Sequence, residues 1–126
     1  MGKVFIICPV RGMNEKERSH LETYVTALEK DGHVVHYPPR DTDQGDPVGL
    51  DICSQNKRAL LEADEVHVYW NASSEGSKFD MGMAFAADKP IHIINKEDVQ
   101  KTEGKSINNV VLALDRTHVV ATDKIE

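Results

Sequence analysis

The sequence predicts one α/β domain of 126 residues built on a doubly wound parallel sheet. Short, nearly continuous apolar segments of strand length alternate with longer segments whose apolar residues recur at helical spacing. The short segments are rich in β-branched residues, as strands buried on both faces of a parallel sheet are. Turn-forming residues separate the two kinds of segment. We expect a flavodoxin-like or Rossmann-like three-layer sandwich with about four or five strands.

The first strand and helix are expected in residues 3–31. Residues 3–8 (KVFIIC) are almost all apolar, and Pro9 ends the strand. The loop at 9–14 (PVRGMN) leads into a helix, for which Gly32 is the stop signal. Apolar residues at i, i+3, i+4 and i+7 mark the buried side of this helix.

A second strand, a long loop and a second helix follow. The strand is expected at 33–37 (HVVHY) and the helix at 50–63. The segment between them, 38–47, is rich in Pro, Asp and Gly. At about ten residues it is long for a connection of this type. We therefore interpret it as a candidate binding loop.

The centre of the domain is expected at residues 65–87, as strand, turn and helix. Residues 65–70 (EVHVYW) form the strand, 71–76 form a polar turn, and Ser77 is expected to cap the helix. The buried stripe of this helix is expected to consist of Phe79, Met83, Ala86 and Ala87. Gly82 costs about 1 kcal/mol against Ala inside a helix, which predicts close packing of the helix onto the sheet.

The C-terminal part adds a strand, a charged loop and a helix. The strand is expected at 90–94 (PIHII) and the loop at 95–105. Ser106 can cap the last helix. A further edge strand is expected at 118–121 (HVVA).

The composition excludes several classes of partner. The net charge of −6 argues against nucleic-acid polymers and anionic membranes. No stretch is long and apolar enough to span a bilayer, and the N-terminal apolar run is too short for a signal peptide. Two cysteines, Cys8 and Cys53, suggest neither a disulfide framework nor a zinc site, so reduced thiols in a cytoplasmic protein are expected. The histidines are scattered, and neither a metal nor another cofactor is expected.

The common nucleotide-binding motifs are absent from the sequence. There is no G-x-G-x-x-G after a strand and no G-x-x-x-x-G-K-[ST], so neither a dinucleotide Rossmann site nor a P-loop is expected. A receiver domain would need acidic residues where this chain has Cys8-Pro9 and Trp70-Asn71. Ligands of open α/β sheets bind beyond the carboxyl ends of the strands. Asp80, after the central strand and turn, is therefore the first carboxylate to consider.

Three stretches together resemble one enzyme superfamily. They are residues 5–12 (FIICPVRG), 60–68 (LLEADEVHV) and 74–84 (SEGSKFDMGMA). Their order and spacing are similar to those of the nucleoside 2-deoxyribosyltransferases, and more closely to those of the smaller 2′-deoxynucleoside 5′-monophosphate N-glycosidases. The resemblance covers about residues 3–95.

The resemblance implies that a carboxylate on the helix after the third strand attacks C1′ of a sugar. The base leaves, and water or another base resolves the covalent glycosyl-enzyme, as in retaining glycosidases. The nucleophile position falls on Asp80, where the family has Glu, and a second family acid falls on Asn56. The family's Arg-Gly pair falls on Arg11 and Gly12, and its phosphate-binding Ser falls on Ser74.

Structural interpretations stand beside these roles. Asp80 could complete a capping box begun by Ser77. Ser74 and Gly76 could form the turn rather than bind a phosphate. Trp70 could pack in the core or stack on a base.

Two departures from the family bear on activity. Asp80 is one methylene shorter than Glu, and a displacement of ~1 Å can lower a rate about 10²-fold. Asn56 can orient a ligand or contact a helix, but it cannot donate a proton as a general acid. Glu75, a second carboxylate in the turn, could take that part.

The sequence therefore supports an N-glycosidase or deoxyribosyltransferase acting on a nucleoside or nucleoside 5′-monophosphate. The alternative is a non-catalytic nucleotide-binding module on the same fold, and a third possibility is a structural assembly subunit. We also expect a homodimer or larger closed assembly. The apolar side chains that suggest an interface are Tyr24, Met81, Met83 and Phe85.

Overall fold

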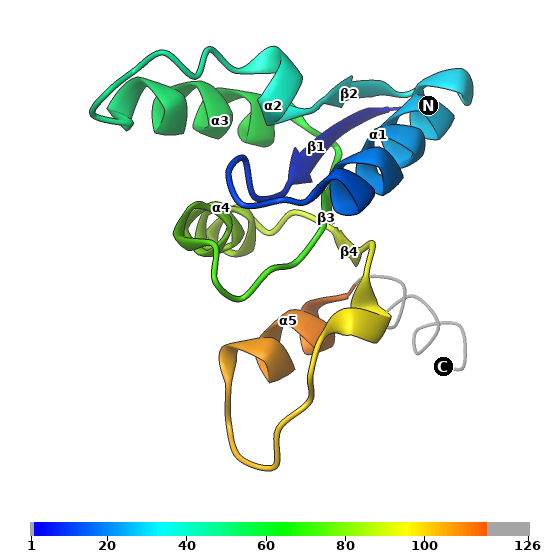
Figure 1. Cartoon of the computed structure of the whole chain (residues 1–126), viewed down its shortest axis with the longest axis vertical. Coiled ribbons are helices and arrows are strands. Elements are labelled where there is room, and N and C mark those ends of the chain that lie inside the picture. The colour runs from blue at the N-terminus through cyan, green and yellow to red at the C-terminus, as the bar shows by residue number, and fades with distance from the viewer. Residues whose placement is uncertain (1, 116–126) are drawn as a thin grey trace.

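The structure, a computed structural model, describes residues 2–115 and contains a four-stranded parallel sheet in the order β2-β1-β3-β4 (Figure 1). The strands of this part of the chain are β1 (Lys3–Ile7), β2 (Val34–His36), β3 (Glu65–Val68) and β4 (Ile91–Ile93). Its helices are α1 (Glu15–Lys30), α2 (Pro38–Asp41), α3 (Leu50–Glu62), α4 (Glu75–Ala86) and α5 (Ile107–Leu114), with a short 3-10 helix at Lys96–Asp98. The predicted α/β fold with a doubly wound parallel sheet is confirmed.

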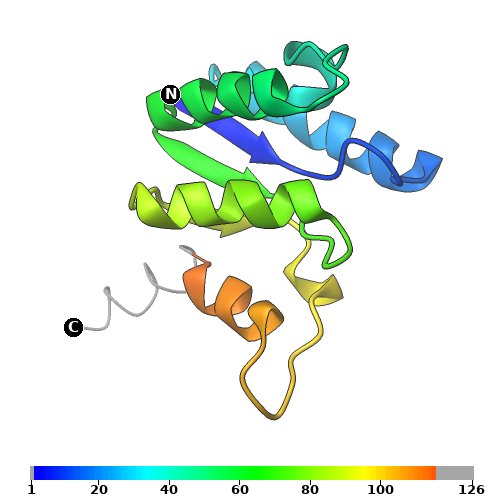
Figure 2. The ribbon, with the colours of Figure 1, turned by 90° about the vertical axis from the view of Figure 1, so that its left-hand side faces the viewer.

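Helices cover both faces of the sheet and make the three expected layers. On one face α1 packs through Leu21 and Val25 against the strands. On the other face α3, α4 and α5 share one larger core, to which they contribute Leu60, Met81 and Val111. Figure 2 shows these three helices side by side on the face turned toward the viewer, with α1 behind the sheet.

The most buried element is β1, which lies between β2 and β3. Its side chains alternate between the two cores: Val4 and Ile6 face α1, whereas Phe5 and Ile7 face α3 and α4. All four are at most 1% exposed. A strand paired on both edges and covered on both faces offers no position to a polar side chain, which explains why every residue of β1 after the exposed Lys3 is apolar.

The start of α4 differs from the prediction by about one turn. Ser74, not Ser77, is the N-cap: its Oγ accepts a hydrogen bond of 3.2 Å from the backbone N–H of Ser77, and the helix begins at Glu75. Asp80 therefore lies in the second turn and takes no part in a capping box. The buried side of the helix consists of Ser77, Asp80, Met81 and Ala84.

Two further predictions about α4 are wrong. Phe79, expected in the buried stripe, is 58% exposed. Gly82 also lies on the exposed side, and a Cβ at this position would meet no atom within 4 Å. Close packing onto the sheet therefore does not explain this glycine. Apolar residues occur on both sides of α4, so their spacing alone could not identify the buried side.

The predicted loop at 38–47 contains a short helix, α2, that the sequence analysis did not predict. Two prolines occupy its first positions, where the missing N–H has no helical partner in any case. Arg40 ties this helix to α1 through an ion pair of 3.1 Å with Glu29, and it contacts Asp41 at 2.8 Å. Only the second half of the segment remains as a loop.

The C-terminal helix begins as predicted. Ser106 is its N-cap, and the Ser106 Oγ accepts a hydrogen bond of 3.1 Å from the backbone N–H of Asn109. The edge strand predicted at 118–121 lies outside the described residues. Within residues 2–115, no helix combines the length and the apolar character needed to cross a membrane.

Candidate active site

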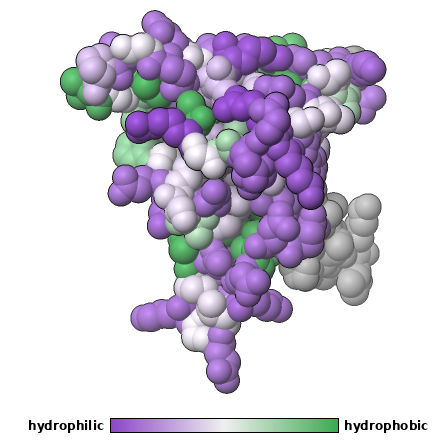
Figure 3. Space-filling view, in the orientation of Figure 1, coloured by the Kyte–Doolittle hydropathy of each residue, from purple (hydrophilic) through white to green (hydrophobic). Residues whose placement is uncertain are grey.

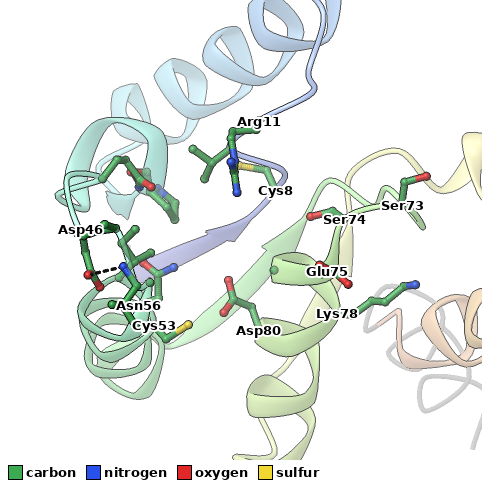
Figure 4. Close-up of a pocket in the computed structure, with 18 of the residues that line it drawn as sticks. Cys8, Arg11, Asp46, Cys53, Asn56, Ser73, Ser74, Glu75, Lys78 and Asp80 are labelled. Atoms are coloured by element: carbon green, nitrogen blue, oxygen red, sulfur yellow. Dashed lines mark hydrogen bonds between the residues drawn. The ribbon is translucent and has the colours of Figure 1, made fainter.

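A cavity of about 960 Å³ opens beyond the carboxyl ends of β1 and β3. The chain leaves β1 toward one edge of the sheet and leaves β3 toward the other, so this is the point where the strand order reverses. Open α/β sheets bind their ligands at such a point. The walls come from the loop after β1, from segment 44–49 with α3, and from the turn that starts α4 (Figure 4).

Most of the residues selected from the sequence meet in this cavity. Those that line it are Arg11, Asn56, Ser74, Gly76 and Asp80, together with the second carboxylate, Glu75. Gly12 and Trp70 do not line it. The residues come from three separate segments of the chain, and the sheet brings them together.

Asp80 is a buried carboxylate to which the described residues offer no partner. It points from α4 into the cavity and is 8% exposed (Figure 4). No group in residues 2–115 donates a hydrogen bond to it. Burial therefore raises the pKa of Asp80 to about 7. Near neutral pH the carboxyl is present in both charge states, and its ionised form is poorly solvated.

Cys8 follows β1 and lies close to Asp80. Burial, together with the negative charge of Asp80, raises the pKa of the Cys8 thiol to about 12, while Arg18 acts in the opposite direction. The thiol is therefore protonated at neutral pH and is not a nucleophile. The second free cysteine, Cys53, also lines the cavity. Neither thiol was predicted to lie in the site, although Cys8 directly follows β1, and ligands of α/β sheets bind beyond such strand ends.

Asn56 is held by a hydrogen-bonded chain of three side chains. The hydroxyl of Thr42 donates to Asn56 Oδ1 at 2.7 Å, and the same Thr42 Oγ1 lies 2.8 Å from His36 Nε2. Asn56 and Thr42 are 6% and 4% exposed. Asn56 was predicted from the sequence, but its two partners, on β2 and in the loop after α2, were not. Nothing in their spacing indicates that these side chains meet.

Donors for an anion surround one side of the cavity. Arg11 is exposed and has no ion-pair or hydrogen-bond partner in the described part of the chain. Gly12, with a φ of 87°, allows the backbone to turn directly after it. The Ser74 hydroxyl and the first N–H groups of α4, at Glu75 and Gly76, complete the set. An anion here would meet a guanidinium, a hydroxyl and a helix N-terminus.

The segment interpreted as a binding loop does border the cavity, through Gln44 and residues 46–49. Its conformation depends on Asp46, whose carboxylate accepts hydrogen bonds from the backbone N–H groups of Val48 at 3.0 Å and Asp51 at 2.7 Å. These bonds place the loop against the start of α3. Asp46 therefore stabilises the conformation of this part of the cavity wall.

Trp70 packs in the core that is shared by α3, α4 and α5. It is 5% exposed, and its Nε1 donates a hydrogen bond of 2.9 Å to Asn108 Oδ1. This is the core-packing interpretation of Trp70. Its indole is not positioned to stack on a ligand in the cavity.

Solved structures of two enzymes share this architecture. A 2-deoxyribosyltransferase from the psychrotolerant bacterium Bacillus psychrosaccharolyticus matches with a TM-score of 0.60 at 17% identity, over 90% of this chain and 96% of that one. The CMP N-glycosidase BcmB of Clostridium botulinum matches with a TM-score of 0.60 at 18% identity, over 90% of this chain and 83% of that one. This chain has the fold of the 2-deoxyribosyltransferases.

A third solved structure, a conserved protein from Enterococcus faecalis V583, matches this fold with a TM-score of 0.64 at 13% identity, over 100% of this chain and 88% of that one. No known protein-family profile matches the chain, and no curated protein matches its sequence. The resemblance seen in the sequence is thus confirmed at the level of the 2-deoxyribosyltransferase fold.

Proposed function

We propose that this protein cleaves the N-glycosidic bond of a nucleoside or nucleoside 5′-monophosphate, with Asp80 as the nucleophile. The observation that carries the proposal is the state of Asp80: a buried carboxylate, aimed into the cavity at the switch point, with no partner in residues 2–115. A carboxylate kept for stability would have a cap, a cation or a donor beside it. The 2-deoxyribosyltransferase fold supports the same assignment.

In the proposed reaction a carboxylate oxygen of Asp80 bonds to C1′ while the bond from C1′ to the base nitrogen breaks. The base leaves with the bonding electrons and takes up a proton. Water then attacks C1′, gives up a proton and releases the carboxylate; a second base in place of water would make the reaction a transfer. Burial favours the first step, because the poorly solvated negative charge disappears when the glycosyl ester forms.

The proton for the leaving base does not come from Asn56, whose amide cannot supply one. Glu75 is the other carboxylate that lines the cavity, and it is exposed to solvent at the first position of α4. In the proposed mechanism Glu75 or solvent protonates the base.

Incubating the protein with a panel of nucleosides and nucleoside 5′-monophosphates, and separating free base by chromatography, tests the proposal. We expect base release from at least one member of the panel. Nucleotide binding without any release would instead support the non-catalytic binding module.

The anion-binding side of the cavity gives a prediction about 5′-phosphate recognition. Arg11→Ala should weaken binding of a nucleoside 5′-monophosphate by roughly 1.5–3 kcal/mol, the range for a hydrogen bond to a charged group. Binding of the matching nucleoside should hardly change, because it lacks the anion. Calorimetric titration of both ligands measures the difference.

Arg58→Ala is the matched control for Arg11→Ala, because Arg58 is an exposed arginine on α3 that does not line the cavity. It should leave both affinities unchanged. Equal losses for nucleotide and nucleoside in Arg11→Ala would contradict the phosphate assignment.

We propose that the enzyme forms a homodimer, the smallest of the closed assemblies expected from the sequence, although the structure changes the residues expected at its interface. Met81 lies in the core, Met83 packs partly against it, and Tyr24 bonds to His67, so only Phe85 of the expected group is exposed, at 63%. Phe79, on the same helix, is also exposed, at 58%. Figure 3 shows hydrophobic residues in small, separate groups on the face that it displays.

Light scattering at micromolar concentration should give twice the protomer mass of 14.1 kDa. Phe85→Glu should reduce this to the protomer mass, because it buries a charge in the interface. A monomer mass for the wild type would reject the dimer.

A further inference from the structure

We propose that Asn56 and Asp80 bind one hydroxyl group of the ligand between them, and that this pair makes the cavity select a ribosyl ligand over its 2-deoxyribosyl counterpart. The identity of the ligand as a nucleoside or nucleotide sugar rests on the proposed function. The selection itself rests on two buried side chains, one of which can only donate a hydrogen bond to the ligand while the other can only accept one.

The partners of Asn56 determine which end of its amide is left for a ligand. Thr42 has one hydroxyl proton, and it donates this proton to Asn56 Oδ1. The contact of 2.8 Å between His36 Nε2 and Thr42 Oγ1 therefore has His36 as the donor. Because this chain occupies the amide oxygen of Asn56, the amide N–H₂ group is what remains for a ligand. No acceptor in residues 2–115 takes it.

Asp80 is a hydrogen-bond acceptor, whereas Asn56 offers a donor. Its ionised carboxylate only accepts hydrogen bonds, and no described residue donates one. Figure 4 shows Asn56 on α3 and Asp80 on α4 directed toward the same space, and both side chains are more than nine-tenths buried. Cys8, Ile52 and Cys53, which line the same cavity, offer at most weak donors or acceptors. A ligand in the cavity can therefore supply both partners.

A hydroxyl group meets this requirement with a single atom, since it can accept from Asn56 and donate to Asp80 at once. If Asp80 attacks C1′, the hydroxyl nearest to its second carboxylate oxygen is the one on C2′, and retaining glycosidases gain stabilisation from this contact. A 2-deoxyribosyl ligand has no such hydroxyl. It would leave the amide of Asn56 buried and unpaired, which disfavours binding.

Thr42 and His36 are positioning residues in this arrangement. They do not touch the ligand, but they fix which end of the Asn56 amide faces it. Without the Thr42 hydroxyl the amide could rotate by 180° and present its oxygen, which cannot donate to the ligand hydroxyl. Ribose selectivity should therefore depend on a side chain outside the cavity wall.

Ribose 5-phosphate and 2-deoxyribose 5-phosphate are suitable probes because neither contains a glycosidic bond to a base, so binding is measured apart from catalysis. Calorimetric titration of the wild type should show ribose 5-phosphate binding at least about tenfold more tightly, as expected when one probe leaves a buried donor unpaired. Asn56→Ala should bring the ratio of the two affinities close to one, because it removes the donor to the ribosyl hydroxyl and also the unpaired amide that disfavours 2-deoxyribose 5-phosphate.

Thr42→Val and Thr42→Ser form a matched pair, and they keep the inference testable if Asn56→Ala does not fold. Thr42→Val removes the hydroxyl at nearly constant volume and should lower the selectivity severalfold, whereas Thr42→Ser retains the hydroxyl and should preserve it. A purely structural role of Thr42 would instead lower both affinities together in both variants.

Equal affinity of the wild type for the two sugar phosphates, or failure to bind either, would overturn the inference. So would unchanged selectivity in both Asn56→Ala and Thr42→Val. These results are separate from the proposed function, which fails only if no nucleoside or nucleotide releases its base. Equal base release from ribosyl and deoxyribosyl substrates would reject the selectivity and retain the N-glycosidase.

Discussion

Asp80→Asn should abolish base release but largely retain nucleotide binding, because the amide oxygen can still accept a hydrogen bond from the ligand hydroxyl. The substitution removes the nucleophile but almost no volume, and losses of about 10⁴-fold or more are typical when a nucleophile is removed. The wild-type rate should also rise with pH through about 7, because only the ionised carboxylate attacks and burial raises the pKa of Asp80 to about 7. Base release from pH 5 to 9, measured at nucleotide concentrations well below KM so that kcat/KM reports the pKa of the free enzyme, checks both statements.

Asp80→Glu shows whether the pocket has adapted to the shorter acid. If α4 carries Asp80 close enough for its oxygen to reach C1′, the wild type is active and Asp80→Glu is slower, because the longer side chain crowds the sugar. If the pocket keeps the geometry that suits Glu, wild-type turnover is low and Asp80→Glu raises it, by up to about 10²-fold for a gap of ~1 Å. Undiminished turnover in Asp80→Asn would exclude Asp80, and Glu75 would be the next carboxylate to replace.

The fold could be predicted from the sequence because the sheet imposes strong local patterns. Each strand of the sheet has a short apolar segment, and for β1 the reason is visible: both faces and both edges are covered. Helix ends were predicted well where one cap was available, as at Ser106. At α4 two serines three residues apart could both act as caps, and the wrong choice moved Asp80 from the second turn to the first.

The site could be predicted only in part. Arg11, Ser74 and Asp80 follow strand ends, so the general rule for α/β sheets points to them without knowledge of distances. The bonding of Asn56 depends on how the loop after α2 folds back against α3, which no local pattern encodes. The burial of Asp80 could not be predicted either. Its neighbours Phe79 and Met81 are both apolar, yet only Met81 faces the core.

The burial of Asp80 has a consequence for stability that does not depend on any substrate. Because the folded state raises the pKa from its ordinary value of 3.8 to about 7, the folded protein holds this proton more tightly than the unfolded chain. The neutral carboxyl stabilises the folded state fully below pH 3.8, the pKa of Asp80 in the unfolded chain. This stabilisation is lost as the pH rises through about 7, the pKa of Asp80 in the folded protein. Asp80 thus destabilises the fold at the pH where its ionised form is the proposed nucleophile.

The free energy of unfolding should therefore fall more steeply with pH in the wild type than in Asp80→Asn. Between pH 5 and pH 8 the wild type should lose roughly 2–3 kcal/mol more than the variant, whose amide does not titrate. Urea unfolding of both proteins at both pH values measures this. Groups that titrate equally in both proteins cancel in the comparison, and so does any pH-independent effect of the amide.

Lys57→Ala, at an exposed position of α3, is a control that should keep the wild-type pH dependence. Parallel pH profiles of the unfolding free energy for wild type and Asp80→Asn would mean that the carboxylate is solvated in the folded protein. Burial would then not make Asp80 reactive.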